Sequence, residues 1–174
     1  MTAPIKEAIV ALPGPASDIY RRHQMVWQFM HRKARSGSDF TFAMVADRMA
    51  LVRSTCLPFG RPSAVSDGLI TLDTVALVRN AFGEAPVPDV KAKAFAATLL
   101  GTHGFAVHAL RVSRHRAETG LKQRCGRTFR ISLPVRTIVA DVRVADPRAA
   151  ADAWLHGVGR GKRFGFGMLR HSVC

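Results

Sequence analysis

The chain has 174 residues, 48% of them apolar, which is enough to bury the core of one ordinary domain or of two small ones. Its 26 lysines and arginines outnumber 12 acidic residues and give a formal net charge of +14, which predicts a polyanionic partner, with nucleic acid the leading candidate. No apolar run approaches the about 18 residues of a membrane span, and residues 1–7 lack the pattern of a signal peptide, so we expect no membrane association.

The three cysteines form an odd and scattered set without the spacing of a zinc site. Such cysteine usage fits a reducing compartment, and we expect a cytoplasmic protein that needs no metal or other cofactor. The three residues are Cys56, Cys125 and Cys174.

Residues 1–85 are predicted to form a first domain. A helix should begin at Ser17 or Asp18, because apolar residues then recur at helical spacing as far as Met30. Strands are expected at residues 5–12, 40–45, 49–53, 69–72 and 75–78, the last being compatible with a helix as well. Residues 55–68 are too short and too rich in proline for a second full helix.

The proline-rich residues 85–88 predict a domain boundary, and residues 89–174 should form a second domain. Helices are expected from Asp89 to Leu100 and from Pro147 to His156, and strands at residues 105–112, 127–135, 137–144 and 164–169. Strands flanking helices in both halves indicate an α+β fold of tandem ferredoxin-like (RRM-like) domains. The first domain is expected to be trimmed.

Positive charge is concentrated in residues 111–136, where Glu118 is the only acidic residue. Residues 118–121 have turn character, so this segment predicts a basic hairpin that projects from a sheet and contacts RNA. A solvated charged surface is the alternative, but clustered cations repel one another when no polyanion neutralises them. The cations are Arg111, Arg114, Arg116, Lys122, Arg124, Arg127, Arg130 and Arg136.

Five glycines and three cations stand among residues 157–167, after the predicted last helix. This composition predicts a loop that binds a phosphate chain, because glycine permits close backbone approach and the cations attract an anion. Nucleotide-binding loops lie between a strand and a following helix, the reverse of the order here, so a nucleotide cofactor is disfavoured. Glycines that serve turns alone are the other alternative. The expected RNA contacts are Gly157, Gly159, Arg160, Gly161 and Arg163.

Residues 138–169 run from a strand through Asp146-Pro147 and a short helix to Gly-Val-Gly-Arg-Gly-Lys-Arg-Phe-Gly-Phe-Gly-Met-Leu. This run resembles the C-terminal signature of CRISPR repeat endoribonucleases of the RAMP superfamily, in particular the CasE-like (type I-E-like) branch. Members of that family cut precursor CRISPR RNA at the repeat stem-loop without a metal. Many stay bound to the product as a subunit of the interference complex. The resemblance implies the same fold. It also implies that the repeat RNA and other subunits of the complex are partners.

Tyr20 and His23 are three residues apart on the first predicted helix, so they share one face. His23 lies on the apolar stripe, and its position alone favours a hydrogen-bonded core histidine, whereas Tyr20, the only tyrosine, lies at the edge of the stripe. CasE-like nucleases carry Tyr-x-x-His followed by a hydrophobic residue and tryptophan, which Val26 and Trp27 match. The resemblance therefore implies catalytic roles for Tyr20 and His23.

RNA carries its own nucleophile, the 2′-hydroxyl beside the scissile phosphate, so cleavage needs only a base, an acid and charge stabilisation. His23 can take or relay the 2′-hydroxyl proton, Tyr20 can orient or protonate, and Lys162 or Arg160 can offset charge on the phosphorane. The products would be a 2′,3′-cyclic phosphate or its opened 3′-phosphate, and a 5′-hydroxyl. The sequence leaves open which of Tyr20 and His23 is the acid.

The acidic residues are single and dispersed, which disfavours a metal-dependent nuclease. We therefore expect a metal-independent endoribonuclease that cleaves precursor CRISPR RNA at the 3′ base of the repeat stem-loop. A non-catalytic RNA-binding subunit of a ribonucleoprotein complex is the alternative. Six further histidines are weaker catalytic candidates because they have no paired acid–base group nearby in the sequence: His31, His103, His108, His115, His156 and His171.

Overall fold

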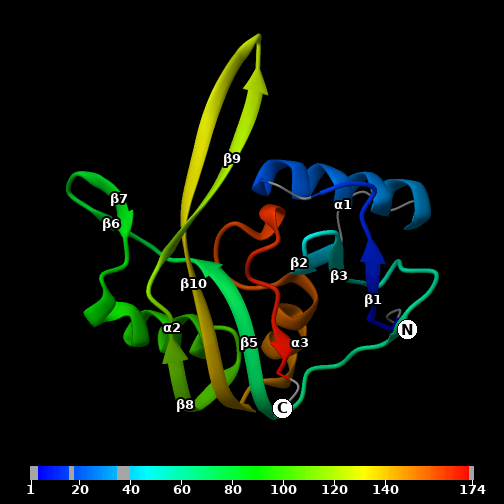
Figure 1. The fold of residues 1–174 in the computed structure, drawn as a ribbon. Coiled ribbons are helices and arrows are strands. Elements are labelled where there is room, and N and C mark those ends of the chain that lie inside the picture. Colours follow the sequence, from blue (N-terminus) through cyan, green and yellow to red (C-terminus); the bar gives the residue numbers. More distant parts are fainter. Residues whose placement is uncertain (1–3, 16–17, 35–39, 173–174) are drawn as a thin grey trace.

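The computed structural model describes residues 4–15, 18–34 and 40–172, and it contains two main antiparallel sheets (Figure 1). The first sheet has the strand order β2-β3-β1-β4, and the second has the order β11-β5-β10-β8 with β9 paired to β10. Each order is that of a ferredoxin-like unit, in which the first and third strands are central. The predicted α+β fold with tandem ferredoxin-like units is confirmed.

In its described residues the first unit contains a single helix, packed on one face of its sheet. Apolar side chains of that helix, Met25, Val26 and Met30, form a buried core with Phe42 and Val52 of the sheet. No helix stands between its third and fourth strands, so the unit is trimmed as expected. Its elements are β1 (Lys6–Ala11), α1 (Ile19–Ala34), β2 (Phe40–Ala46), β3 (Met49–Ser54) and β4 (Arg61–Pro62).

The second unit is complete and has its own core, in which Leu72, Leu100, Ile138 and Trp154 are fully buried. Asp146 caps α3 as predicted, accepting hydrogen bonds from the backbone N–H groups of residues 148 and 149. The elements are β5 (Gly68–Val75), α2 (Ala92–Gly101), β8 (Phe105–Val112), β9 (Arg116–Arg124), β10 (Arg127–Val144), α3 (Pro147–His156) and β11 (Arg170–His171). The short hairpin β6 (Leu77–Asn80)–β7 (Gly83–Pro86) and the 3-10 helix η1 (Asp89–Lys91) connect β5 to α2.

The two sheets do not divide the chain at residues 85–88, where the boundary was predicted. β5 precedes that segment, yet it pairs with β10 from Gly68 opposite Val142 to Val75 opposite Val135. The change from one sheet to the other therefore lies between β4 and β5. The prolines at positions 86 and 88 end β7 and precede η1, so they mark a turn inside the second unit.

Three predicted strands also differ from the structure. Residues 127–135 and 137–144 form one continuous strand, β10, whose first half reaches beyond the sheet (Figure 1). Residues 164–169 are not a strand, because Gly165 and Gly167 have φ angles of 86° and 81°, outside the extended region. They follow a 3-10 helix, η2 (Lys162–Phe164), and only Arg170–His171 pairs with β5.

The predicted basic hairpin exists, but its turn lies at Cys125 and Gly126 and not at residues 118–121. Both turn residues have positive φ, 49° and 72°, as a two-residue hairpin turn of the I′ type requires. Gly120 instead lies within β9, buried against the start of α1, where a Cβ would stand 2.8 Å from the Cγ1 of Ile19. The hairpin is thus packed on α1 near its base while its tip projects from the body (Figure 1).

Arg53 of β3 links the two units from a buried position. Its Nη1 donates hydrogen bonds to the carbonyls of Trp154 (2.7 Å) and Leu169 (3.0 Å), and its Nη2 donates to Glu7 Oε2 (3.0 Å). The guanidinium carbon lies 3.8 Å from the ring centroid of Trp154, and only 1% of the residue is exposed. Burial lowers the pKa of Arg53 to about 10, so the side chain stays charged at neutral pH.

Replacing Arg53 with Met should destabilise the protein by about 3–5 kcal/mol, because it leaves Glu7 and two carbonyls without their buried donor. The free energy of unfolding, measured by denaturant titration, tests this. Arg61→Met is the control: Arg61 pairs with the same carboxylate at 3.5 Å, but its side chain is 82% exposed, so its loss should cost under about 1 kcal/mol. Equal losses in the two variants would contradict the role given to Arg53.

Candidate functional site

The loop between α3 and β11, residues 157–169, folds against α1 and forms a pocket with it. We call this segment the glycine loop and the pocket the α1 pocket. The pocket has a volume of about 440 Å³. Its wall comes from α1, from β2, from the end of α3 and from η2 of the glycine loop. The lining residues are His23, Trp27, Phe40, Phe42, His156, Lys162 and Arg163.

His23 is half-buried in this pocket, and its ring meets that of Phe164 edge to face at a centroid distance of 6.3 Å. Its Nδ1 is buried and has no hydrogen-bond partner among the described residues. Burial lowers the pKa of His23 below its usual 6.5; the positive charge of Arg163 lowers it further, and the nearby backbone of Arg163 acts in the opposite direction. His23 is therefore a neutral imidazole at pH 7, the form that can accept a proton.

Two cations of the glycine loop line the same pocket. Lys162 is exposed, and its Nζ donates to the carbonyl of Gly157 at 3.4 Å. Arg163 is exposed next to Phe164, with 5.7 Å between its guanidinium carbon and the ring centroid. Arg160, predicted as an alternative to Lys162, does not line the pocket and is paired with Glu84 of β7 at 2.5 Å. The pocket thus combines a neutral base with cations suited to a phosphate.

Tyr20 lies one helical turn before His23 but does not line the α1 pocket. Its backbone N–H is capped by Asp18 Oδ1 at 2.8 Å, and a Cβ added to Gly120 of β9 would stand 3.1 Å from the same backbone nitrogen. Tyr20 is therefore at the base of the hairpin. Of the three residues predicted to be catalytic, the structure brings His23 and Lys162 into one pocket, whereas Tyr20 is not part of its lining.

The glycines let the backbone of the glycine loop pack directly against other parts of the protein. Gly157, Gly159 and Gly161 all have positive φ, between 71° and 79°. A Cβ at these positions would stand 2.9 Å from the Gly167 oxygen, 2.8 Å from Thr74 Oγ1 and 2.6 Å from a Val75 methyl, respectively. Gly159 and Gly161 are needed to seat the loop on β5, and Gly157 is needed where the loop packs on itself at Gly167. An RNA contact through their backbone stays a prediction.

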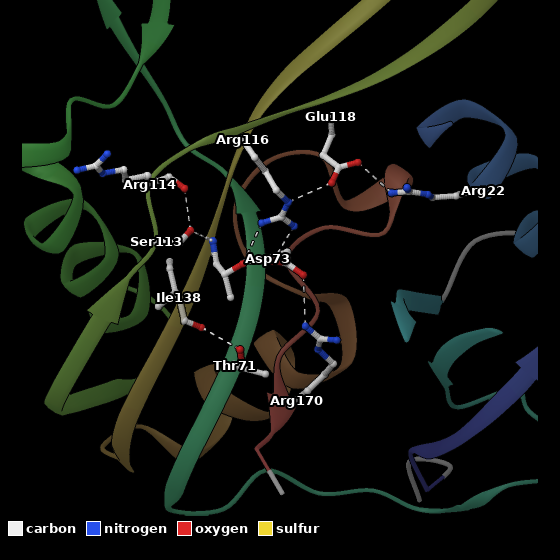
Figure 2. A network of polar contacts seen from close by, with 10 residues as sticks. Arg22, Thr71, Asp73, Ser113, Arg114, Arg116, Glu118, Ile138 and Arg170 are labelled. Atoms are coloured by element: carbon white, nitrogen blue, oxygen red, sulfur yellow. Dashed lines mark hydrogen bonds and ion pairs between the residues drawn. The ribbon is translucent and has the colours of Figure 1, made fainter. Parts of the chain in front are cut away.

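The cations of the hairpin segment fall into two groups. Arg116 donates to Asp73 Oδ1 at 3.0 Å and to Glu118 Oε1 at 3.1 Å, and Glu118 also pairs with Arg22 of α1 (Figure 2). Arg136 is 1% exposed and bonded to Asp89 at 2.6 Å. These two arginines form ion pairs within the fold. No ion pair within the described ranges involves the others whose side chains are described: Arg111, Arg114, Lys122, Arg127 and Arg130.

The pocket contains two groups that the sequence did not single out as part of the site. His156 was set aside for lack of a partner, yet its Nδ1 lies 3.0 Å from Asp152 Oδ1. Trp27 is 40% exposed at the pocket wall, and its ring stacks on that of His31 at 4.1 Å. The spacing of four residues between Asp152 and His156, directly before the glycine loop, is the sequence signal that could have found the first.

Within residues 4–15, 18–34 and 40–172, no three His, Cys, Asp or Glu side chains gather as they would around a metal ion. In the same ranges no helix is both long and apolar enough to cross a membrane.

No family model matches the sequence, and no curated protein sequence matches it. Solved structures do. A CRISPR endoribonuclease Cse3 bound to a 19-nucleotide RNA superposes with a TM-score of 0.76 and 15% identity, covering 98% of this chain and 99% of that one. The CRISPR-associated protein Cas6e from Escherichia coli K-12 gives 0.62 and 14%, covering 95% and 97%. A chain of a CRISPR RNA-guided surveillance complex gives 0.60 and 14%, covering 94% and 97%. At such identities these matches show a common fold over the whole chain, in agreement with the resemblance seen in the sequence.

The environment of His23 predicts how it titrates. In an NMR titration of the histidine rings, His23 should have a pKa below 6.5, and Arg163→Gln should raise it by removing a nearby positive charge. Arg160→Gln is the matched control, because Arg160 is paired with Glu84 and should leave the His23 pKa unchanged. A His23 pKa above 6.5, or equal shifts in both variants, would contradict this electrostatic coupling.

Proposed function

We propose that the protein is a metal-independent, CasE-like endoribonuclease that binds the stem-loop of a CRISPR repeat and cleaves precursor CRISPR RNA at its 3′ base. The observation that carries the proposal is the α1 pocket, which sets the neutral imidazole of His23 beside the cations Lys162 and Arg163. The pocket lies in a fold shared over its whole length with an RNA-bound Cse3 endoribonuclease. A basic hairpin projects from the same body and offers cations to an RNA backbone.

The pocket fits cleavage by the 2′-hydroxyl of the RNA. His23 would take the 2′-hydroxyl proton as the oxygen attacks phosphorus, and its neutral form at pH 7 and its partly desolvated site support this role. Lys162 and Arg163 would stabilise the negative charge that develops on the phosphorane. The products are a 2′,3′-cyclic phosphate, or the 3′-phosphate formed when it opens, and a 5′-hydroxyl. Tyr20, at the base of the hairpin, would orient the RNA strand as it enters the pocket.

We further propose that the protein keeps its product and serves as a subunit of an interference complex in the cytoplasm. The similarity to a chain of a CRISPR RNA-guided surveillance complex supports this proposal. Retention follows physically if the stem-loop is held by many phosphate contacts that cleavage at its base does not remove. The repeat RNA and other subunits of such a complex are then its partners.

A non-catalytic RNA-binding subunit is the second candidate function. The position of Tyr20 outside the α1 pocket favours it, because the resemblance implies that both Tyr20 and His23 act in catalysis. Cleavage of a repeat RNA by the purified protein decides between the two functions.

His23→Ala should abolish cleavage of a repeat RNA and change stem-loop binding little, because His23 transfers a proton and does not anchor the phosphate. Wild-type cleavage should persist in excess chelator and stop when the scissile nucleotide carries a 2′-deoxy sugar. Single-turnover rates, binding titrations and thermal melting measure these effects. A parallel loss of binding, cleavage and melting temperature would mark His23 as a core residue, and sensitivity to chelator would exclude the mechanism.

The hairpin cations should contribute mainly to the affinity for RNA, and Lys162 of the glycine loop should contribute mainly to the rate of cleavage. Lys122→Ala and Arg127→Ala should each weaken binding and flatten the log–log salt dependence by about one unit, because each removes one phosphate contact. Lys162→Ala should lower the single-turnover rate more than the affinity. Arg116→Ala is the control on the same hairpin: its side chain is engaged by Asp73 and Glu118, so the salt slope should change less. Equal salt slopes for the wild type, Lys122→Ala, Arg127→Ala and Arg116→Ala would contradict this assignment of affinity to the hairpin.

A further inference from the structure

His156 is the last residue of α3, and it lies between a carboxylate and the α1 pocket. Its Nδ1 is 3.0 Å from Asp152 Oδ1, one turn earlier on the same helix, and 45% of its side chain is exposed. It lines the α1 pocket together with His23 and Lys162, whereas Asp152 does not. The Nζ of Lys162 donates to the carbonyl of the next residue, Gly157, so His156 stands beside the cationic side of the pocket.

Transesterification of RNA needs two proton transfers, and His23 provides for one. As the bond from O2′ to phosphorus forms, the 2′-hydroxyl loses a proton; as the bond from phosphorus to O5′ breaks, the leaving oxygen gains one. Lys162 and Arg163 stabilise charge, and Tyr20 lies outside the pocket. Among the side chains that line the α1 pocket, His156 is the remaining imidazole, the side chain that enzymes use most often as a general acid or base.

We propose that His156 is the general acid that protonates the 5′-oxygen, and that Asp152 is its positioning residue. The assignment rests on the proposed function and extends it. With Nδ1–H held by Asp152, the other ring nitrogen, Nε2, remains to carry the transferred proton, an arrangement that fixes both tautomer and ring orientation. The proton from O2′ passes to His23, the proton of His156 Nε2 passes to O5′, and the two rings exchange their protonation states through solvent before the next turnover.

The Asp152–His156 pair lies at the surface, with 72% of the Asp152 side chain and 45% of the His156 side chain exposed. A surface pair at this spacing contributes little to stability, so folding alone gives no strong reason for it. Its location at the wall of the pocket that contains His23 instead indicates a role in the reaction.

The test compares two repeat RNAs, one unmodified and one with sulfur in place of the 5′-bridging oxygen at the scissile position. A thiolate leaves without protonation, so the sulfur substrate does not need the acid. His156→Ala should cleave the unmodified RNA roughly 10²–10⁴-fold more slowly than wild type and cleave the sulfur substrate at close to the wild-type rate. Asp152→Asn should show the same pattern with a smaller loss, and His23→Ala should be slow on both substrates because it lacks the base.

His108→Ala, which changes an exposed histidine on β8, should match wild type on both substrates. Melting temperatures check that each variant folds. If wild type cleaves but His156→Ala is unimpaired, or is equally impaired on both RNAs, the assignment of His156 is overturned while the endoribonuclease stands. If the wild-type protein cleaves neither RNA, the endoribonuclease fails and this inference fails with it.

Discussion

The buried guanidinium of Arg53 is the interaction on which the geometry of the α1 pocket depends. Arg53 belongs to the first unit, and it binds the carbonyl of Trp154, three residues before the glycine loop, and that of Leu169, the last residue of the loop. One side chain therefore fixes both ends of the loop and joins the two units. Because the pocket is formed between α1 of the first unit and this loop, its shape follows from that link. A buried charge is costly unless it is paired, and the carboxylate of Glu7 and the ring of Trp154 interact with this one.

The glycines then determine where the cations of the loop stand. A Cβ at Gly165 would meet the ring of Phe42 at 2.6 Å, and one at Gly167 would collide with the Val158 carbonyl, so the chain lies directly on its neighbours at both points. This seating turns η2 toward α1 and brings Lys162 and Arg163 to His23. Burial lowers the pKa of His23 and the positive charge of Arg163 lowers it further, while both cations would attract the phosphate on which the imidazole acts.

Sequence patterns predicted the class of fold and part of the site, and their failures have physical causes. Periodicity identified residues 69–72 as strand, but it carries no information on the pairing partner, and β5 pairs with β10. The hairpin turn was missed because Cys125, a residue rarely found at positive φ, occupies its first position. Arg116 and Arg136 looked like RNA contacts until the fold brought Asp73 and Asp89 to them from far along the chain. Tertiary contacts likewise bring His156 of α3 into the same pocket as His23 of α1.

If the scissile region of the RNA occupies the α1 pocket, the fluorescence of Trp27 should detect that occupancy directly. The chain has two tryptophans; Trp154 is 1% exposed beneath Arg53, whereas Trp27 is 40% exposed at the pocket wall. Titrating the protein with an uncleavable repeat RNA that carries one 2′-deoxy sugar should quench the tryptophan fluorescence, because nucleobases in the pocket would lie against the indole. The quench should disappear in Trp27→Phe while binding persists. Tight binding without any change in the fluorescence of the wild-type protein would contradict the account.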